Sequence, residues 1–316
     1  MLKSRFNIQS FALHTAFRIS RGVKTHIDVV WAVLEDECRN TGYGEAVPYA
    51  RYGESAQGVL DQLKSFSEKL HQGFSRHDLC SVLPAGAARN AFDCALWDME
   101  EDHDLPDYLP TAQTVVLGKP EDMANKAAEM KSDTLKIKLG TPGDMDALRA
   151  VHKRAPDKNI IVDANEGWSL EDLRSLLPQM KELGVCLIEQ PLPAESDDGL
   201  RELDSPIPFY ADESVHSVKD LPSLEGKYQG VNIKLDKSGG LTAAKTLKQE
   251  ARAAGFDIMI GCMVCTSLSI RPALQLTDGV KWIDLDGAYW LKDDPYGPLI
   301  DFESYLKGSG FPVRKP

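Results

Sequence analysis

The sequence predicts an α/β protein in which a parallel barrel of eight strands follows a smaller α+β domain. After about residue 110, short apolar segments alternate with amphipathic helical segments. From residue 138 to residue 234, the candidate strand ends recur every 22 to 26 residues, which is the length of one strand and one helix. Before residue 110 the strands come first and the helices second, an order typical of α+β domains.

Within the first domain, residues 1–110, we expect strands from the start to Leu13 and over residues 27–35. A turn at residues 39–42 and a return strand toward Glu45 follow. Helical periodicity covers residues 54–70 and 85–100. The acidic, proline-containing stretch 100–110 is expected to be a linker.

The second domain, residues 111–290, contains the alternating pattern. Helices between its strands have recognisable starts, such as Ser169 with Asp172 three residues later, a capping-box variant. Eight strands is the number in a parallel (β/α)₈ barrel. The expected strands are residues 113–117, 134–139, 159–163, 185–189, 208–212, 231–235, 257–261 and 281–286.

Composition and charge restrict the class of protein. The 316 residues are 42% hydrophobic and 27% charged, which is compatible with a large core. A formal net charge of −12 without a basic block argues against nucleic acid and anionic membranes as partners. No apolar run approaches the roughly 18 residues of a membrane span, and the start of the chain lacks a secretory signal. We therefore expect a cytoplasmic protein.

The cysteines are scattered along the chain. This pattern favours reduced core residues over a disulfide framework. Cys262 and Cys265 have the spacing of a redox motif, but a single pair without a second pair makes a poor zinc site.

Two lysines stand out in the segment Thr-Leu-Lys-Ile-Lys-Leu at residues 134–139. Lys136 and Lys138 are two residues apart, so in a strand both point to the same face. A buried lysine is rare without a partner or a function, and a pair suggests a site that lowers a lysine pKa. The alternative from this segment alone is an edge strand with a solvated polar face.

Three carboxylates end consecutive predicted strands, at Asp163, Glu189 and Asp212. In a (β/α)₈ barrel the carboxyl ends of the strands face the active site, so these groups are expected to converge. A set of oxygen ligands suits Mg²⁺ better than zinc or copper. Any one of these residues could instead cap the following helix, but three in successive units favour a metal site.

The position of Lys234, in the sixth predicted strand, adds a second inference. Strands two and six of eight are half a turn apart, so Lys138 and Lys234 are expected to face each other across the site. One lysine could remove a proton from a carbon and the other could return a proton to the opposite face. That reaction is racemisation or epimerisation.

With these lysines and carboxylates, the sequence resembles the enolase superfamily, in its muconate lactonising enzyme subgroup. The resemblance covers nearly the whole chain and implies a modified TIM barrel, (β/α)₇β, with an N-terminal α+β capping domain. It also implies that residues 291–316 return to the cap. The motifs that carry the resemblance are Lys136-Ile-Lys138, Asp163-Ala-Asn165, Glu189-Gln-Pro191, Asp212-Glu-Ser214 and Lys234 within Val-Asn-Ile-Lys-Leu-Asp-Lys-Ser-Gly-Gly.

The resemblance implies catalysis by Lys138 and Lys234, with Lys136 beside them, and one Mg²⁺ per subunit that stabilises an ene-diolate. The implied metal ligands are the three carboxylates above. A second ammonium about 7 Å from a lysine destabilises the charged form of that lysine by roughly 2.4 kcal/mol, at an effective dielectric constant near 20. That is too little to make a lysine of ordinary pKa a good base at neutral pH. We expect the metal ion and desolvation to supply the rest.

Other residues concern the substrate. Asp284 and Asp286, at the end of the eighth predicted strand, resemble the paired aspartates with which dipeptide epimerases bind the α-amino group. Arg21 resembles an arginine that meets a glutamate side chain, and Arg51 and Thr134 are assigned to substrate binding with it. The expected reaction is inversion of the glutamate α-carbon in L-Ala-D/L-Glu dipeptides from murein.

Several alternatives remain open from the sequence. An epimerase of another dipeptide, an o-succinylbenzoate synthase or a cycloisomerase would use the same lysines and metal, although neither of the last two has a substrate ammonium for Asp284 and Asp286 to bind. A non-catalytic dipeptide-binding barrel would not need two opposed lysines. The expected partner is a small dipeptide, and a homo-oligomer is compatible with the sequence.

Overall fold

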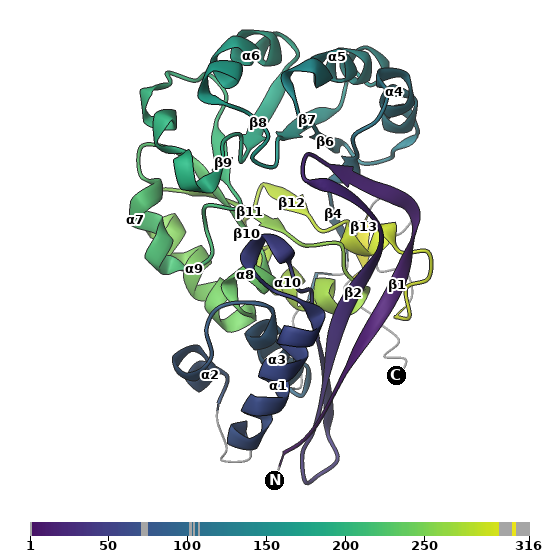
Figure 1. Cartoon of the computed structure of the whole chain (residues 1–316), viewed down its shortest axis with the longest axis vertical. Coiled ribbons are helices and arrows are strands. Elements are labelled where there is room, and N and C mark those ends of the chain that lie inside the picture. Colours follow the sequence, from purple (N-terminus) through teal and green to yellow (C-terminus); the bar gives the residue numbers. More distant parts are fainter. Residues whose placement is uncertain are drawn as a thin grey trace.

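The computed structural model describes residues 2–70, 75–100, 103, 105–106, 108–296 and 305–307. An antiparallel sheet and a group of helices form the N-terminal cap (Figure 1). Strand β2 pairs with both other strands of this sheet. The cap elements are β1 (Lys3–Ile19), β2 (Gly22–Glu35), β3 (Thr41–Ala46), α1 (Ala56–Leu70), α2 (Arg76–Val82) and α3 (Ala87–Asp98).

The β1–β2 hairpin is longer than the sequence suggested. Strand β1 continues past Leu13 to Ile19, and β2 begins at Gly22 rather than at Ile27. Its outer half pairs across the hairpin although most of its side chains are exposed, and only Phe17 and Ile19 alternate there with exposed polar residues, which is a short signal for a strand. The hairpin rises along one side of the barrel and carries its tip to the barrel mouth (Figure 1).

Helix α2 was also not expected. Ser75 begins it with a capping box, because its hydroxyl accepts from the N–H of Asp78 and its own N–H donates to the Asp78 side chain. A seven-residue helix is too short to show clear periodicity.

Eight parallel strands form the barrel, in sequential order. The first and last of them close it, because the N–H of Ala112 donates to the carbonyl of Ile283 (2.8 Å). The barrel and the cap confirm the predicted fold class. The strands are β5 (Gln113–Val115), β6 (Thr134–Lys138), β7 (Asn159–Asp163), β8 (Val185–Glu189), β9 (Phe209–Ala211), β10 (Gly230–Ile233), β11 (Asp257–Gly261) and β12 (Trp282–Asp284).

Helices surround the barrel, and their apolar faces pack on the outward side chains of the strands in one continuous core. A separate apolar cluster fills the inside of the barrel. Its members are Ile161, Leu187, Tyr210, Met259 and Trp282. The barrel-domain helices are α4 (Pro120–Glu129), α5 (Met145–Arg154), α6 (Leu170–Glu182), α7 (Leu221–Leu224), α8 (Leu235–Ser238), α9 (Leu241–Ala253) and α10 (Ser267–Ala273).

The cap docks on the barrel through buried polar contacts. Arg89 of α3 donates to the carbonyls of Ser238 (2.6 Å) and Gly239 (2.9 Å), which end helix α8. Glu45 of β3 accepts from the backbone (2.9 Å) and hydroxyl (2.6 Å) of Thr266, before α10. These contacts fix how the cap covers the carboxyl ends of the barrel strands.

Strand β5 ends at Val115, two residues before its predicted end, β6 and β9 each end one residue early, and two further strand ends affect the site. Strand β10 stops at Ile233, so Lys234 is the residue that starts helix α8. Strand β12 stops at Asp284, and Asp286 instead begins a 3₁₀ turn at Gly287–Trp290. Both differences arise because the chain turns into a helical segment directly at the barrel mouth, where periodicity gives no boundary.

Parts of the predicted linker and C-terminal segment, residues 101–102, 104, 107, 297–304 and 308–316, lie outside the described residues. Within the linker, β4 (Tyr108–Pro110) pairs with β13 (Tyr305–Lys307). Leu291 forms a β-bridge with Leu13 of β1. Among the residues that the structure describes, no helix combines the length and apolar character needed to cross a membrane.

Candidate active site

Charged residues converge at the carboxyl ends of the central barrel strands. Strand register pairs Lys138 with Asp163, and Asp163 with Glu189, at one level of the barrel. Asp212 follows β9 directly. The three carboxylates point inward because each lies two residues after an inward-facing apolar residue, such as Ile161 before Asp163, and Lys138 lies two residues after the inward-facing Lys136. The apolar cluster therefore forms the floor of a polar site.

Lys136 lies at the centre of this site. Its Nζ lies 2.6 Å from Glu189, 2.7 Å from Asp284 and 3.0 Å from Asp163. The side chain is 1% exposed, and burial lowers its pKa, but the carboxylates of Asp284, Glu189 and Asp163 outweigh burial and raise the pKa well above its usual value. Lys136 is thus a buried cation that neutralises several carboxylates.

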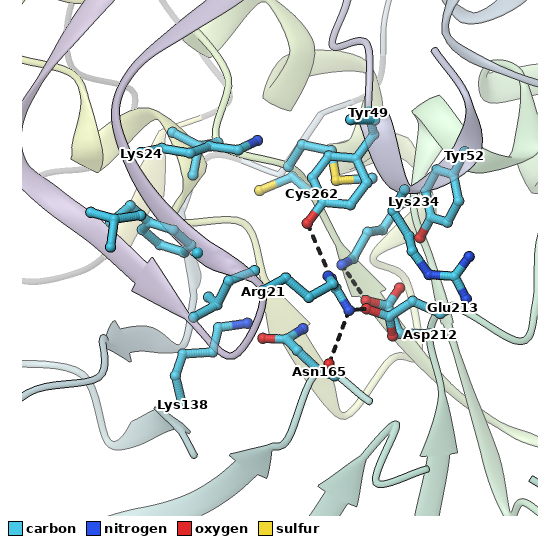
Figure 2. Close-up of a pocket in the computed structure, with 18 residues that line it drawn as sticks. Arg21, Lys24, Tyr49, Tyr52, Lys138, Asn165, Asp212, Glu213, Lys234 and Cys262 are labelled. Atoms are coloured by element: carbon cyan, nitrogen blue, oxygen red, sulfur yellow. Dashed lines mark hydrogen bonds and ion pairs between the residues drawn. The ribbon is translucent and has the colours of Figure 1, made fainter. Parts of the chain in front are cut away.

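Lys138 and Lys234 each contact a different carboxylate. The Nζ of Lys138 lies 2.6 Å from Oδ2 of Asp163, and the Nζ of Lys234 lies 2.6 Å from Oδ2 of Asp212. Both lysines are buried and line one cavity of about 550 Å³. Figure 2 shows them on two sides of the Arg21 guanidinium, Lys138 from the end of β6 and Lys234 from the segment that follows β10. Both lysines thus lie at one cavity, and their catalytic role stays a prediction.

Lys234 has a carboxylate partner, Asp212, that the sequence did not reveal. Burial lowers its pKa, but the nearby Asp212 carboxylate outweighs burial, and the net direction is upward. Repulsion between the lysines is therefore opposed by the carboxylates that pair with them.

Asp212 is held from two sides. Lys237 donates to its Oδ1 (2.5 Å) and to its carbonyl. The Oε1 of Gln190, which follows Glu189, accepts from the N–H of Asp212 (2.9 Å). Gln190 adopts a positive φ of 35°, which turns its side chain across the gap between β8 and β9. Neither contact was anticipated from the sequence.

The donor set fits a hard divalent cation. Asp163, Glu189 and Asp212 supply buried carboxylate oxygens at adjacent strand ends. Several further buried oxygens around them accept no hydrogen bond, namely Oδ1 of Asn165, Oε2 of Glu189, Oε2 of Glu213, Oδ1 of Asn232 and Oδ1 of Asp284. Within the described part of the chain, no three His, Cys, Asp or Glu side chains are already arranged as a metal centre. Lysine ammonium groups lie against the carboxylates instead.

The two predicted arginines both lie at the cavity. Arg21, at the hairpin tip, contacts Glu213 (2.7 Å) and Glu166 (3.0 Å). Arg51 contacts Glu166 (2.7 Å) and Glu195 (2.6 Å). Two arginines thus face three glutamates, which leaves a net charge of −1 from these five side chains. Arg21 and Arg51 already have carboxylate partners within the chain.

Lys24 is a cavity residue that the sequence analysis missed. It lines the cavity close to Arg21, and its Nζ lies 4.7 Å from the centroid of the Tyr49 ring (Figure 2). No ion pair to Lys24 occurs among the described residues. Only the extended hairpin brings it to the barrel mouth, and the sequence analysis ended the first strand before that point.

The predicted aspartates lie beside the site rather than on the wall of the cavity. Asp284 contacts Lys136, as described above. Oδ2 of Asp286 accepts from the N–H of Thr114 (2.7 Å), and burial together with the charge of Asp284 raises the pKa of Asp286 to about 6. Thr114, in register with Lys136, is a further polar residue that the sequence analysis did not consider.

Thr134 is not brought to the site. It begins β6, four residues before Lys138, and therefore lies toward the amino end of the barrel. Its N–H donates to the hydroxyl of Ser132 (3.1 Å). A strand rises about 3.3 Å per residue, so the length of the strand separates Thr134 from the cavity.

The two cysteines with redox spacing have different environments. Cys262 lines the cavity, whereas Cys265 is fully buried, and burial raises the pKa of Cys265 well above its usual value. All six cysteines are free thiols, as the sequence suggested.

The geometry of the barrel and its site indicates the family of the protein. A barrel with lysines and carboxylates at its carboxyl ends, under an α+β cap, defines an enolase-type enzyme. Residues 121–302 match the family described as enolase C-terminal domain-like. The chain therefore belongs to the enolase superfamily, and it is an enzyme of the racemase and epimerase class, as predicted.

Two similar relatives are bacterial isomerases. The L-Ala-D/L-Glu epimerase of Escherichia coli is 45% identical over 93% of this chain and 95% of its own length. The N-acetyl-D-glutamate racemase of a Pseudoalteromonas species is 43% identical over 78% of this chain and 82% of its own length.

Two similar solved structures contain dipeptides. An enolase family member from Agrobacterium tumefaciens, with bound sodium and L-Ala-L-Glu, has a TM-score of 0.94 and 42% identity, and the match covers 98% of both chains. A dipeptide epimerase from Enterococcus faecalis, in complex with Mg and L-Leu-L-Tyr, has a TM-score of 0.89 and 26% identity over 96% of both chains.

Proposed function

We propose that this enzyme inverts the glutamate α-carbon of L-Ala-D/L-Glu dipeptides with the help of one Mg²⁺ ion. The observation that carries the proposal is the pair of lysines, Lys138 and Lys234, on the wall of one cavity. The similarity to an L-Ala-D/L-Glu epimerase over nearly the whole chain supports the choice of substrate. Such dipeptides are murein fragments, so the proposed role is the recycling of murein peptides.

The two lysines divide the reaction between the faces of the substrate carbon. One lysine, as a neutral amine, accepts the α-proton, and the other, as an ammonium, donates a proton to the opposite face. The roles exchange for the other diastereomer. Lys136 remains protonated, because its three carboxylate neighbours stabilise the charged form.

Asp163, Glu189 and Asp212 would hold the Mg²⁺ ion, with oxygen ligands of the type that this ion prefers. When bound, the ion would stabilise the negative charge that develops on the substrate carboxylate as the α-proton leaves. Nearby buried oxygens that accept no hydrogen bond, such as Oδ1 of Asn165 and Oε2 of Glu213, support a cation at this position.

Charged residues near the cavity are suited to bind the α-amino group and the side-chain carboxylate of the substrate. Asp284 and Asp286 are proposed to receive the α-amino group, and the oxygen of Asp284 that accepts no hydrogen bond is suited to this role. Lys24 is proposed to meet the side-chain carboxylate, because Arg21 and Arg51 are already paired with glutamates.

The test is proton NMR in D₂O with purified protein, Mg²⁺ and L-Ala-L-Glu. The glutamate α-proton signal should disappear while the D-Glu diastereomer forms. Omission of Mg²⁺ and addition of EDTA should stop both changes. If neither exchange nor inversion occurs with Mg²⁺ bound, Ala-Glu is not the substrate.

A second candidate is racemisation of an N-acylated glutamate. Asp284 contacts Lys136, and Asp286 contacts the backbone of Thr114, so neither lines the cavity. A substrate without an ammonium group would not need them, and one similar relative is an N-acetyl-D-glutamate racemase. The same NMR experiment with N-acetyl-D-glutamate separates the two candidates, since the preferred substrate has the higher kcat/KM.

A further inference from the structure

Lys237 lies behind the proposed metal site and does not line the substrate cavity. It is the third residue of the short helix α8 and comes one turn after Lys234. Its side chain is 1% exposed. A fully buried lysine far from the substrate normally needs several acceptors to compensate for its lost hydration. Those acceptors indicate what the residue does.

All acceptors of the Lys237 ammonium belong to the ends of β9 and β10. The Nζ donates to Oδ1 of Asp212 (2.5 Å), to the carbonyl of Asp212, and to the carbonyl of Asn232 (3.0 Å). Asn232 in turn donates through Nδ2 to Oε1 of Glu189 (2.8 Å). One ammonium thus connects two of the three proposed metal ligands through one intermediate residue.

These contacts divide the two oxygens of Asp212 between different partners. Oδ1 is bound by Lys237 on the inner side, whereas Oδ2 faces Lys234 at the cavity. The backbone of Asp212 is held as well, because its N–H donates to Gln190 and its carbonyl accepts from Lys237. The Asp212 carboxylate therefore has one defined orientation, with Oδ2 toward the reacting centre.

From this arrangement we infer that Lys237 is a positioning residue that orients Asp212 for coordination of the divalent cation. The inference rests on the proposed function, which places Mg²⁺ on Asp212. Lys237 acts through Asp212 and does not line the cavity.

A neutral substitution of Lys237 should change the affinity for Mg²⁺ in opposite directions, depending on whether Lys237 acts as a positive charge or as a positioning residue. If Lys237 matters only as a positive charge, its removal relieves repulsion and tightens Mg²⁺ binding. If it positions Asp212, its removal frees the carboxylate to rotate, and Mg²⁺ binding weakens. Loss of an orienting outer partner typically costs about 10- to 100-fold in metal affinity.

The experiment is calorimetric titration of Mg²⁺ into the parent protein, Lys237→Met and Lys227→Met. Lys227 is a matched control, because it is also a buried lysine that pairs with an aspartate, Asp197, and makes no contact with Asp212. Both substitutions should lower the urea midpoint of unfolding by similar amounts. Only Lys237→Met should raise the Kd for Mg²⁺, by fivefold or more.

A smaller rise, an unchanged Kd or tighter binding in folded Lys237→Met would overturn the inference. If Lys237→Met does not fold, Lys237→Gln, which keeps one donor and removes the charge, is titrated against the same limits. If the parent itself does not bind Mg²⁺, the metal part of the proposed function fails, and this result is distinct from failure of the inference about Lys237.

Discussion

The ammonium groups of Lys138 and Lys234 approach one cavity from strands half a turn apart in the barrel. In a two-base reaction, each lysine serves one face of the substrate carbon. A proton that faces the remaining lysine can still be removed and returned to the same face after the other lysine is lost. Inversion and exchange therefore respond differently to single substitutions.

We predict that Lys138→Ala and Lys234→Ala each abolish inversion, with losses of at least about a hundredfold. Each variant should keep α-proton exchange with at most one diastereomer. The diastereomer that still exchanges should differ between the two variants. The measurement is NMR in D₂O with L-Ala-L-Glu and L-Ala-D-Glu separately. Inversion at the parent rate in either variant would refute the two-lysine mechanism.

A single residue, Lys24, is also expected to select a substrate with an acidic side chain. We predict that Lys24→Met lowers kcat/KM for L-Ala-L-Glu about tenfold, because the substrate carboxylate loses a charged partner. The kcat/KM for L-Ala-L-Leu should change little. Lys3→Met, on the same hairpin but far from the cavity, is the control. Equal losses for both dipeptides would show that Lys24 does not select the side chain.

At the scale of elements, the cap depends on close contact between strand β3 and helix α3. A Cβ at Gly44 would lie 2.0 Å from the carbonyl oxygen of Ala91 and 2.8 Å from the N–H nitrogen of Ala95. Both are backbone atoms, which cannot rotate away. Only glycine allows the strand to lie this close to the helix.

We therefore predict that Gly44→Ala lowers the free energy of unfolding by about 3 kcal/mol or more, because the helix must move away from the strand. Gly143→Ala is the control, since the nearest atom to its Cβ would be at 3.6 Å, and it should change stability by less than about 0.5 kcal/mol. Urea unfolding followed by circular dichroism measures both. Equal stabilities would mean that β3 and α3 do not pack this closely.

The hairpin is the element that the site depends on most. Its tip carries Arg21 and Lys24 over the barrel mouth, and the hydroxyl of Ser20 donates to the carbonyl of Asn165 (2.9 Å). Its outer half contributes little to the core, so its position depends on such polar contacts with the barrel.

At the scale of the whole molecule, the interface between cap and barrel contains a buried acid. Oδ1 of Asp236 accepts from the N–H of Val47 (2.9 Å) and from Nδ2 of Asn90 (2.9 Å), both in the cap. Burial raises the pKa of Asp236 from 3.8 to about 8. The folded protein thus holds a proton here that the unfolded chain releases near pH 4.

The sign of the pH effect follows from this difference. Because the folded state binds more protons than the unfolded state between about pH 4 and pH 8, stability falls as the pH rises through this range. Asp236→Asn keeps an oxygen for both donors and has no proton to lose. We predict that between pH 6 and pH 9 Asp236→Asn loses roughly 2.7 kcal/mol less stability than the parent.

Urea unfolding at several pH values tests this prediction. Glu45, whose pKa burial raises to about 7, also lowers stability as the pH rises, so both proteins keep some slope. Parallel pH profiles for the parent and Asp236→Asn would show that Asp236 is already ionised in the folded state.

The barrel and most of the site followed from local sequence patterns. Three barrel strands, β7, β8 and β11, match their predicted bounds, because apolar strands between amphipathic helices give a strong periodic signal. The side-chain period of two residues placed Lys136 and Lys138 on one face, and the strand ends marked Asp163, Glu189 and Asp212.

Tertiary structure alone decided the partners of these residues. Lys237, Gln190 and Thr114 reach the site through contacts between strands distant in sequence, and no local pattern marks such contacts. Lys24 depends on the outer half of a hairpin where apolar alternation is short, and Thr134 lies at the far end of its strand. The sequence by itself determined which charged groups face the barrel mouth, because strand periodicity is local. The structure decided which of them pair, because pairing depends on distances across the closed barrel and its cap.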